Sequence, residues 1–183
     1  MIIKDTSSAL ILIDIQKGFN DFEYWGKRNN LNFEKNIIKL INKYRERSLQ
    51  IIHIQHSSLN SNSPLNKNSI GFSFMDCATP ISDEPVFQKQ VNSAFIGTNL
   101  ETFLRERKIQ NLTMAGLTTD HCVSTSCRMA ANLGFSVVLI QDAMATFDRK
   151  SADGQTFSAE LVHEVSLASL NGEFCKIEPT ENH

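Results

Sequence analysis

The chain has 183 residues, of which 41% are hydrophobic, and its formal charge is -2 at pH 7. This length predicts one domain spanning residues 1–183, because it is enough for one buried core and too short for two. The small net charge gives no long-range field that would attract nucleic acid or an anionic membrane, so small ligands or protein partners are expected.

The start of the chain and the cysteines indicate a compartment. Residues 1–8 lack the charged head and long apolar core of a signal peptide, and no apolar run reaches membrane-spanning length, so we expect a cytosolic protein. The cysteines, at positions 77, 122, 127 and 175, show neither Cys-x-x-Cys nor zinc spacing. On one helix, Cys122 and Cys127 would lie roughly 8–9 Å apart, which exceeds disulfide reach. Four reduced thiols are expected, with Cys127 packed or near the surface.

The first half of the chain alternates strand and helix patterns. Residues 9–13 form an uninterrupted apolar run, typical of a buried parallel strand. Residues 20–32 predict a loop, residues 33–47 an amphipathic helix, and residues 50–55 a second strand followed by His56. Residues 57–85 are rich in Ser, Asn and Pro, and so long a connection usually covers a site or forms an interface. Val86 and Phe87 predict a short third strand.

The second half continues the same alternation. Residues 98–101 have a capping-box pattern that predicts a helix to about Arg107. A strand at residues 112–115 and a helix that Gly134 ends come next. Residues 136–140 predict a strand tipped by Asp142. The spacing of four apolar residues predicts a last helix before an edge strand at residues 174–177: Phe157, Leu161, Val165 and Ala168.

This order of elements predicts the fold class. Nearly continuous apolar strands alternating with helices form a parallel sheet covered on both faces. Right-handed crossovers make such a sheet doubly wound. We therefore expect an α/β protein with a three-layer α/β/α sheet of about six mostly parallel strands.

Residues 111–130 carry the strongest chemical signal. They predict a strand, a tight turn and a helix, with Thr119 or Asp120 as the N-cap and Cys122 in the first helical turn. A thiol near the positive end of a helix dipole loses its proton more easily. The alternative interpretation is that Cys122 is a buried cysteine that behaves as a small hydrophobic residue.

Two further charged residues follow predicted strands. Asp14 ends the first strand, at the edge where open α/β sheets bind ligands, although a turn or capping aspartate is the alternative. Lys89 follows the third strand, although most such lysines are solvated surface residues. If Asp14, Lys89 and Cys122 meet, the carboxylate can take the thiol proton while the ammonium stabilises the thiolate.

Three segments resemble, in order, the motifs of the isochorismatase-like cysteine hydrolases, which include nicotinamidases, N-carbamoylsarcosine amidohydrolases and streptothricin hydrolases. They are residues 11–19 (Ile-Leu-Ile-Asp-Ile-Gln-Lys-Gly-Phe), 89–95 (Lys-Gln-Val-Asn-Ser-Ala-Phe) and 115–123 (Ala-Gly-Leu-Thr-Thr-Asp-His-Cys-Val). The resemblance covers nearly the whole chain. It implies that Asp14 is the catalytic base, Lys89 the second triad member and Cys122 the nucleophile.

The resemblance implies further features of the nucleophile loop and of the assembly. A non-proline cis peptide is expected between Leu117 and Thr118. The backbone N–H groups of Thr118 and Cys122 would then form the oxyanion hole, where one donor is commonly worth about 3 kcal/mol of barrier. A homodimer or homotetramer is also implied.

This sequence differs from some family members at motif positions, and these differences limit the reactions that we expect. Metal-binding nicotinamidases carry Asp-x-His after the second strand and another histidine further on. Here Gln55 and His56 occupy that place and the next histidine is His121, so we predict no metal site and no cofactor. Members that cleave the vinyl ether of isochorismate typically lack the cysteine. Cys122 therefore favours hydrolysis of a small amide at its C–N bond.

Four more residues are candidates for substrate contact: Phe19, His56, Phe95 and His121. Each has an alternative role, since phenylalanines are usually core residues and His56 can simply end a strand. His121 is interpreted as pocket lining rather than a base, because residues adjacent on a helix point in different directions. Two other functions stay open: a non-catalytic descendant that binds a metabolite or scaffolds a partner, and a thiol redox sensor at Cys122.

Overall fold

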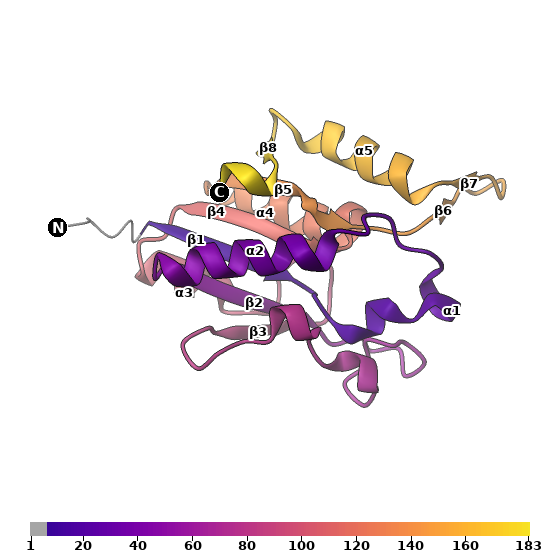
Figure 1. Cartoon of the computed structure of the whole chain (residues 1–183), viewed down its shortest axis with the longest axis horizontal. Helices are drawn as coiled ribbons and strands as arrows, with labels where there is room; N and C mark the ends of the chain where they lie inside the picture. The colour runs from indigo at the N-terminus through magenta and orange to yellow at the C-terminus, as the bar shows by residue number, and fades with distance from the viewer. Residues whose placement is uncertain (1–6) are drawn as a thin grey trace.

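Six parallel strands form the central sheet, in the order β3-β2-β1-β4-β5-β8 (Figure 1). The computed structural model describes residues 7–183. The strands are β1 (Ser8–Ile13), β2 (Gln50–His56), β3 (Val86–Lys89), β4 (Asn111–Leu117), β5 (Ser136–Ala145) and β8 (Lys176–Glu178). The order places β1 and β4 at the centre of the sheet, so the segments that follow these two strands are neighbours in space.

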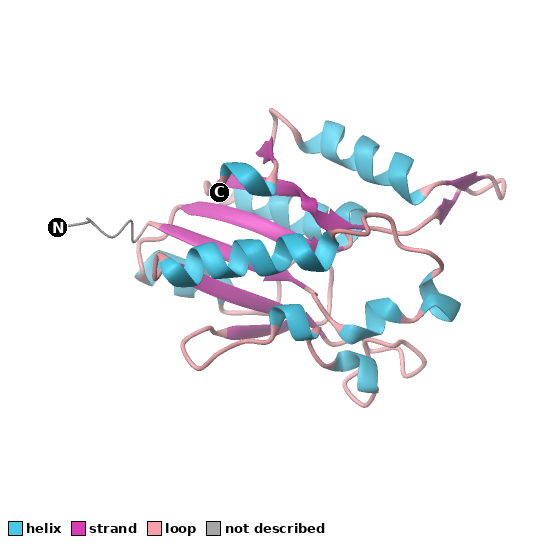
Figure 2. Cartoon of the chain, in the orientation of Figure 1, coloured by secondary structure: helices cyan, strands magenta, loops and turns pink. Residues whose placement is uncertain are grey.

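Helices cover both faces of the sheet (Figure 2). The helix α2 packs on one face, and α3 and α4 pack on the other. The helices are α1 (Phe22–Trp25), α2 (Phe33–Glu46), α3 (Leu100–Glu106), α4 (Ser124–Asn132) and α5 (Ala159–Leu170). The remaining elements are the antiparallel pair β6 (Arg149–Lys150) and β7 (Thr156–Phe157), the π-helical turn η4 (Thr119–Val123), and the 3-10 turns η1 (Lys17–Asn20), η2 (Ile70–Phe72), η3 (Asp76–Ala78) and η5 (Thr180–Asn182). The expected doubly wound α/β fold is confirmed.

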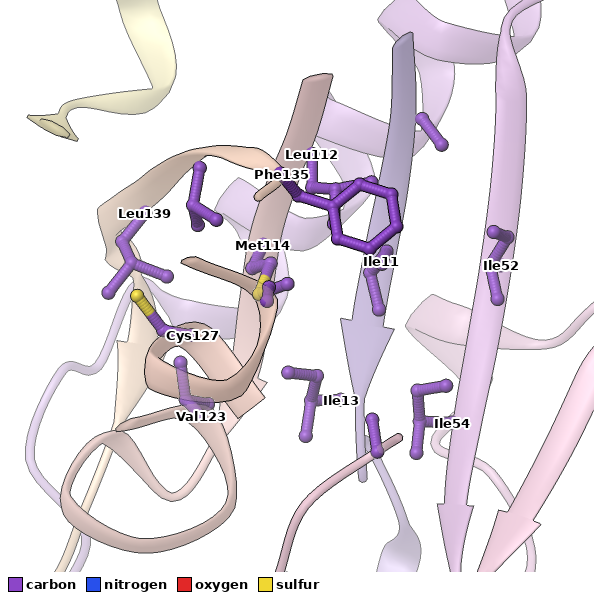
Figure 3. Packing of buried hydrophobic residues seen from close by; sticks show 14 of the residues in the cluster. Ile11, Ile13, Ile52, Ile54, Leu112, Met114, Val123, Cys127, Phe135 and Leu139 are labelled. Carbon is purple, nitrogen blue, oxygen red and sulfur yellow. The ribbon is translucent and has the colours of Figure 1, made fainter. Parts of the chain in front are cut away.

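The central strand β1 contributes to the core on both sides. Ile11 and Ile13 belong to the cluster beneath α3 and α4 (Figure 3), whereas Leu10 and Leu12 face α2. These four side chains are at most 1% exposed, and burying each contributes about 1.5–3 kcal/mol. A strand buried on both faces explains the uninterrupted apolar run, because alternate side chains point to opposite faces.

Gly116 lets β4 lie close to β1. Its φ is +131°, and a Cβ at this position would lie 2.0 Å from the carbonyl oxygen of Ile13. Only glycine fits so near a backbone with this conformation. The close approach brings the residue after β1, Asp14, next to the loop that follows β4.

Three local predictions need correction. β5 runs through Asp142 to Ala145, so Asp142 is not a strand tip. Its carboxylate accepts hydrogen bonds from the backbone N–H and hydroxyl of Thr180. The capping box is also wrong, because Asn99 is the N-cap of α3 and its side chain makes no capping hydrogen bond, while the Thr98 hydroxyl donates to the Ala94 carbonyl and accepts from the Leu100 N–H. The predicted loop at residues 20–32 contains the short helix α1.

The last helix has an unexpected orientation. Its predicted apolar stripe faces outward: Leu161 is 46% and Val165 is 59% exposed, and Ala168 is exposed as well. The helix lies beyond the β5 and β8 side of the sheet (Figure 1). In the described part of the chain, no helix is both long and apolar enough to span a membrane. The expectation that the start of the chain is not a signal peptide concerns residues 1–6, which lie outside the described residues. The single domain at 1–183 stays a prediction.

Candidate active site

Three side chains from distant parts of the sequence meet at the carboxyl edge of the sheet. Asp14 follows β1, Lys89 is the last residue of β3, and Cys122 lies in η4, after β4. The Lys89 ammonium donates a hydrogen bond to Asp14 Oδ2 at 2.6 Å and another to Cys122 Sγ at 3.2 Å. The structure thus brings together the three residues that the motifs single out. Their catalytic roles stay predictions.

The three groups are almost completely shielded from water. The side chains of Asp14 and Lys89 are both 0% exposed, and Cys122 is 8% exposed. Within residues 7–183, Asp14 Oδ1 accepts no hydrogen bond. Asp14 also has a left-handed backbone (φ 52°), which turns the chain sharply at the end of β1. A carboxylate oxygen without a donor, next to a thiol, can accept the thiol proton.

The electrostatics correct one expectation from the sequence. Burial, and then the negative charge of Asp14, raise the pKa of the Cys122 thiol far above its usual value, although Lys89 opposes them. Burial also disfavours the charge on Lys89, but Asp14 and Cys122 outweigh it and raise the pKa of Lys89. The resting site therefore holds an ion pair and a neutral thiol, and the predicted easy loss of the thiol proton is wrong for this state.

The nucleophile loop has the predicted cis peptide bond, between Leu117 and Thr118. Cys122 follows in η4 rather than in the first turn of an ordinary α-helix. The predicted N-cap is wrong, because Thr118 precedes the turn in an extended conformation and makes no capping hydrogen bond with its side chain. The assignment of the Thr118 and Cys122 N–H groups to an oxyanion hole stays a prediction.

Arg149, whose role the sequence did not predict, hydrogen-bonds to Asp120 and Thr118 of this loop. We call these contacts the Arg149 clamp. Its Nε donates to Asp120 Oδ2 at 2.7 Å, and its Nη2 donates to Asp120 Oδ1 at 3.2 Å and to Thr118 Oγ1 at 3.5 Å. The Thr146 hydroxyl donates to Asp120 Oδ1 at 2.5 Å. Burial would raise the pKa of Asp120, but these bonds outweigh it and lower that pKa. The Asp120 carboxylate therefore pairs with the Arg149 guanidinium and does not cap a helix.

His56 lies against the lysine of the site. It ends β2, beside Lys89 in the parallel register, and its Nδ1 is 3.0 Å from Lys89 Nζ. One atom each from Asp14, His56 and Cys122 lies within 4.8 Å of the others, as in a metal site. The Lys89 ammonium contacts all three residues, so a cationic group already lies among these donors. The predicted absence of a metal stays a prediction.

The other candidates for substrate contact have mixed surroundings. Phe19 is 3% exposed and packs on Trp25, with ring centroids 5.0 Å apart. Phe95 packs against the core, and its ring stacks on Phe135 at 5.9 Å. The His121 side chain is 54% exposed, and its Nε2 is 3.3 Å from Asp120. These contacts favour a core role for both phenylalanines, while substrate contact by any of these residues stays a prediction.

Asn92 is a candidate that the sequence analysis missed. It lies within the 89–95 motif, is exposed, and places its Oδ1 3.9 Å from Cys122 Sγ. Its position inside a motif that already contains Lys89 was the available signal. A contact between Asn92 and a substrate is a prediction.

Comparisons with known proteins place the chain among isochorismatase-related sequences. An isochorismatase domain model matches residues 8–177. The uncharacterized isochorismatase family protein YrdC of Bacillus subtilis (strain 168) is 42% identical over 177 residues, covering 97% of this chain and 94% of that protein. Ureidoacrylate amidohydrolase RutB of Agrobacterium fabrum (strain C58 / ATCC 33970) is 33% identical over 79 residues, covering 43% of this chain and 35% of that protein.

A solved structure shows the same similarity in three dimensions. The crystal structure of an isochorismatase family protein from Chromobacterium violaceum ATCC 12472 superimposes with a TM-score of 0.92 and 38% identity, covering 100% of this chain and 94% of that one. Because the family model and a relative of 42% identity both span nearly the whole chain, the chain belongs to the isochorismatase family of hydrolases.

Proposed function

We propose that this protein is a cysteine amidohydrolase that cleaves the C–N bond of a small amide through a thioester. The observation that carries the proposal is the Lys89 ammonium, which is hydrogen-bonded to both the Asp14 carboxylate and the Cys122 thiol in a buried site. A base, a cation and a nucleophile in contact are the groups that such a reaction needs. The partial similarity to a ureidoacrylate amidohydrolase supports the same class of bond.

The first half of the proposed reaction forms the thioester. Asp14 accepts the thiol proton while Cys122 Sγ forms a bond to the amide carbon, and the carbonyl electron pair moves onto oxygen. The N–H groups of Thr118 and Cys122 are assigned to stabilise this oxyanion. The C–N bond then breaks, and the leaving nitrogen takes the proton from Asp14 and departs as an amine or ammonia.

The second half regenerates the enzyme. Asp14 accepts a proton from a water molecule whose oxygen attacks the thioester carbon. The C–S bond breaks, the acid product leaves, and the proton returns from Asp14 to Cys122 Sγ. A raised thiol pKa suits this cycle, because the proton then leaves the sulfur only when a substrate is in place to be attacked.

The test is a screen of primary amides, lactams and ureido compounds for C–N cleavage. Wild-type protein should turn over one of these classes, and Cys122→Ala and Asp14→Asn should each lower the rate about 100-fold or more without unfolding the chain. Cys77→Ser is the matched control, because this half-buried thiol lies outside the site. Appreciable turnover in both site variants would contradict the mechanism.

The amide screen, together with alkylation and oxidation of Cys122, separates two alternatives. A non-catalytic binding protein would turn over no compound, and Cys122 would react with an alkylating agent at an ordinary rate that does not depend on Asp14. A redox sensor would form a reversible oxidised state at Cys122, resolved by a second thiol. The raised pKa of Cys122 disfavours the sensor, because the thiolate is the form that peroxides oxidise.

A further inference from the structure

The ammonium of Lys89 has one acceptor for each of its three N–H donors. They are Asp14 Oδ2 at 2.6 Å, His56 Nδ1 at 3.0 Å and Cys122 Sγ at 3.2 Å. The lysine side chain is 0% exposed, so water does not replace any of them. A buried charge is tolerated when all its donors are satisfied. The proposed mechanism uses two of these acceptors and leaves His56 without a role.

The surroundings of His56 hold its ring in one chemical form. Nδ1 can accept from the ammonium only if it carries a lone pair, so the ring proton must lie on Nε2. The Val91 backbone raises the pKa of the ring, in opposition to burial and the Lys89 charge. The contact between Nδ1 and the Lys89 ammonium therefore selects the neutral Nε2–H tautomer.

The backbone of His56 is fixed as well. The buried Gln16 side chain accepts from the His56 N–H at 2.8 Å and donates to the His56 carbonyl at 3.1 Å. Both Gln16 and Asp14 belong to the 11–19 motif, so one segment supplies the carboxylate and anchors the histidine. The backbone that carries the imidazole is thus held in place, and the ring itself contacts Lys89.

We propose that His56 is a positioning residue whose neutral Nδ1 holds the Lys89 ammonium between Asp14 and Cys122, and that protonation of this ring releases the lysine. The inference rests on the proposed function, because it assigns a role in the same site. A protonated ring would lose the acceptor and would put two cations 3.0 Å apart. The site would then be correctly arranged only while His56 is neutral.

The charged groups that face His56 set the direction of its titration. They are Lys89 from β3, Asp14 from the end of β1 and Cys122 from η4. Burial, and then the Lys89 charge, lower the pKa of His56, and Asp14 opposes them. The ring is therefore neutral at pH 7, and its protonation begins only as the pH falls below the ordinary histidine value of about 6.5.

The first test reads the tautomer directly by long-range 1H–15N NMR of histidine-labelled protein, with His56→Gln used to assign the signals. His56 should show a protonated Nε2 and an unprotonated Nδ1, and should titrate below the ordinary histidine range. In Lys89→Met its titration should move to higher pH, because the neighbouring cation is gone. A proton on Nδ1, or a titration that Lys89→Met leaves unchanged, would overturn the proposal.

The second test follows the rate of Cys122 alkylation by iodoacetamide against pH. In the wild type the rate should fall more steeply as His56 becomes protonated than the loss of thiolate alone explains. His56→Gln keeps an acceptor oxygen that does not titrate, so its fall should move to lower pH, whereas His56→Ala should lower the rate about tenfold throughout. His183→Gln is the control, because this terminal histidine pairs with Glu178 instead.

The outcomes separate this inference from the proposed function. Asp14→Asn should change the alkylation rate, because the Asp14 carboxylate acts on the Cys122 thiol, and a Cys122 rate that does not depend on Asp14 would count against the proposed function itself. If the rate depends on Asp14 but the pH profile of His56→Gln matches the wild type, only the role of His56 is overturned. Thermal unfolding of each variant identifies any that has lost its fold.

Discussion

Lys89 shows how one residue can depend on its neighbours for its charge. Its side chain is 0% exposed, yet its pKa is raised, because the attraction of the Asp14 charge and the hydrogen bonds to Asp14 and Cys122 outweigh the effect of burial. Breaking a buried ion pair by removing one partner commonly costs 3–5 kcal/mol, because the other charge is left uncompensated. The same lysine therefore contributes to stability and to the proposed chemistry.

Replacing this lysine should test both contributions. Lys89→Met should lower the free energy of unfolding by about 3–5 kcal/mol at pH 7, measured by urea denaturation. In the double variant with Asp14→Asn the loss should be smaller than the sum of the two single losses, because both charges are gone. Lys17→Met is the matched control, since its exposed ion pair with Asp76 should contribute at most about 1 kcal/mol. An equal loss in both lysine variants would contradict this account.

The nucleophile loop is held by contacts with other elements. Arg149 of β6 binds Asp120 through two nitrogens, and the Thr119 hydroxyl lies 2.8 Å from Nδ1 of His163 on α5. A guanidinium that binds a carboxylate through two nitrogens forms a strong ion pair with a fixed geometry. The segment after β5 and the helix α5 thus help to position Cys122 although neither carries a triad residue.

Arg149→Gln should reveal this clamp through the pH dependence of stability. The pKa of Asp120 is lowered in the folded state, so its bonds stabilise the fold at neutral pH, and the contribution is lost as the pH falls through the folded pKa. The variant should lose about 1.5–3 kcal/mol at pH 7, and the difference from the wild type should shrink below about pH 4.

Urea denaturation across that pH range measures the effect of the clamp. Arg47→Gln serves as the control, because Arg47 is exposed at the end of α2 and its replacement should change stability by about 0.5 kcal/mol or less. A difference between wild type and Arg149→Gln that stays constant with pH would show that Asp120 is not the group responsible.

At the scale of the whole molecule, helices pack on both faces of the central sheet, whereas α5 leaves apolar side chains exposed. The helix exposes Leu161 and Val165, although the chain has a core on both faces of the sheet. Exposed apolar side chains on one helix face are a common feature of surfaces that associate. The homodimer or homotetramer that the family resemblance implies stays a prediction, and we propose α5 as the surface on which to test it.

Light scattering after size-exclusion chromatography should therefore give a mass of at least about twice the 20.6 kDa of one chain. Val165→Glu should weaken the assembly if α5 contributes to the interface, because a carboxylate would be buried there. Asp83→Asn is the control, since this exposed residue lies far along the chain from α5. A monomer at micromolar concentration would contradict the prediction.

Much of the fold could be predicted from the sequence because its signals are local. The run at residues 9–13 is apolar at every position, as is typical of a strand buried on both faces. Asp14, Lys89 and Cys122 could be paired in advance because parallel strands all end at the same edge of the sheet. Residue spacing on α5 predicted the helix but not the face that packs, because an amphipathic pattern does not say what lies opposite.

Only the tertiary structure decided the protonation states of the site and the contacts that support it. His56 and Lys89 are 33 residues apart in the sequence, and Arg149 and Asp120 are 29 apart, so no local pattern reports either contact. The thiol pKa depends on burial and on the Asp14 charge, and these oppose the effect expected from the start of a helix. The sequence by itself determined which reactive groups meet, because motifs and strand ends are properties of short segments. Their protonation and support were decided by the tertiary structure, because electrostatic effects and hydrogen bonds act between groups that only folding brings together.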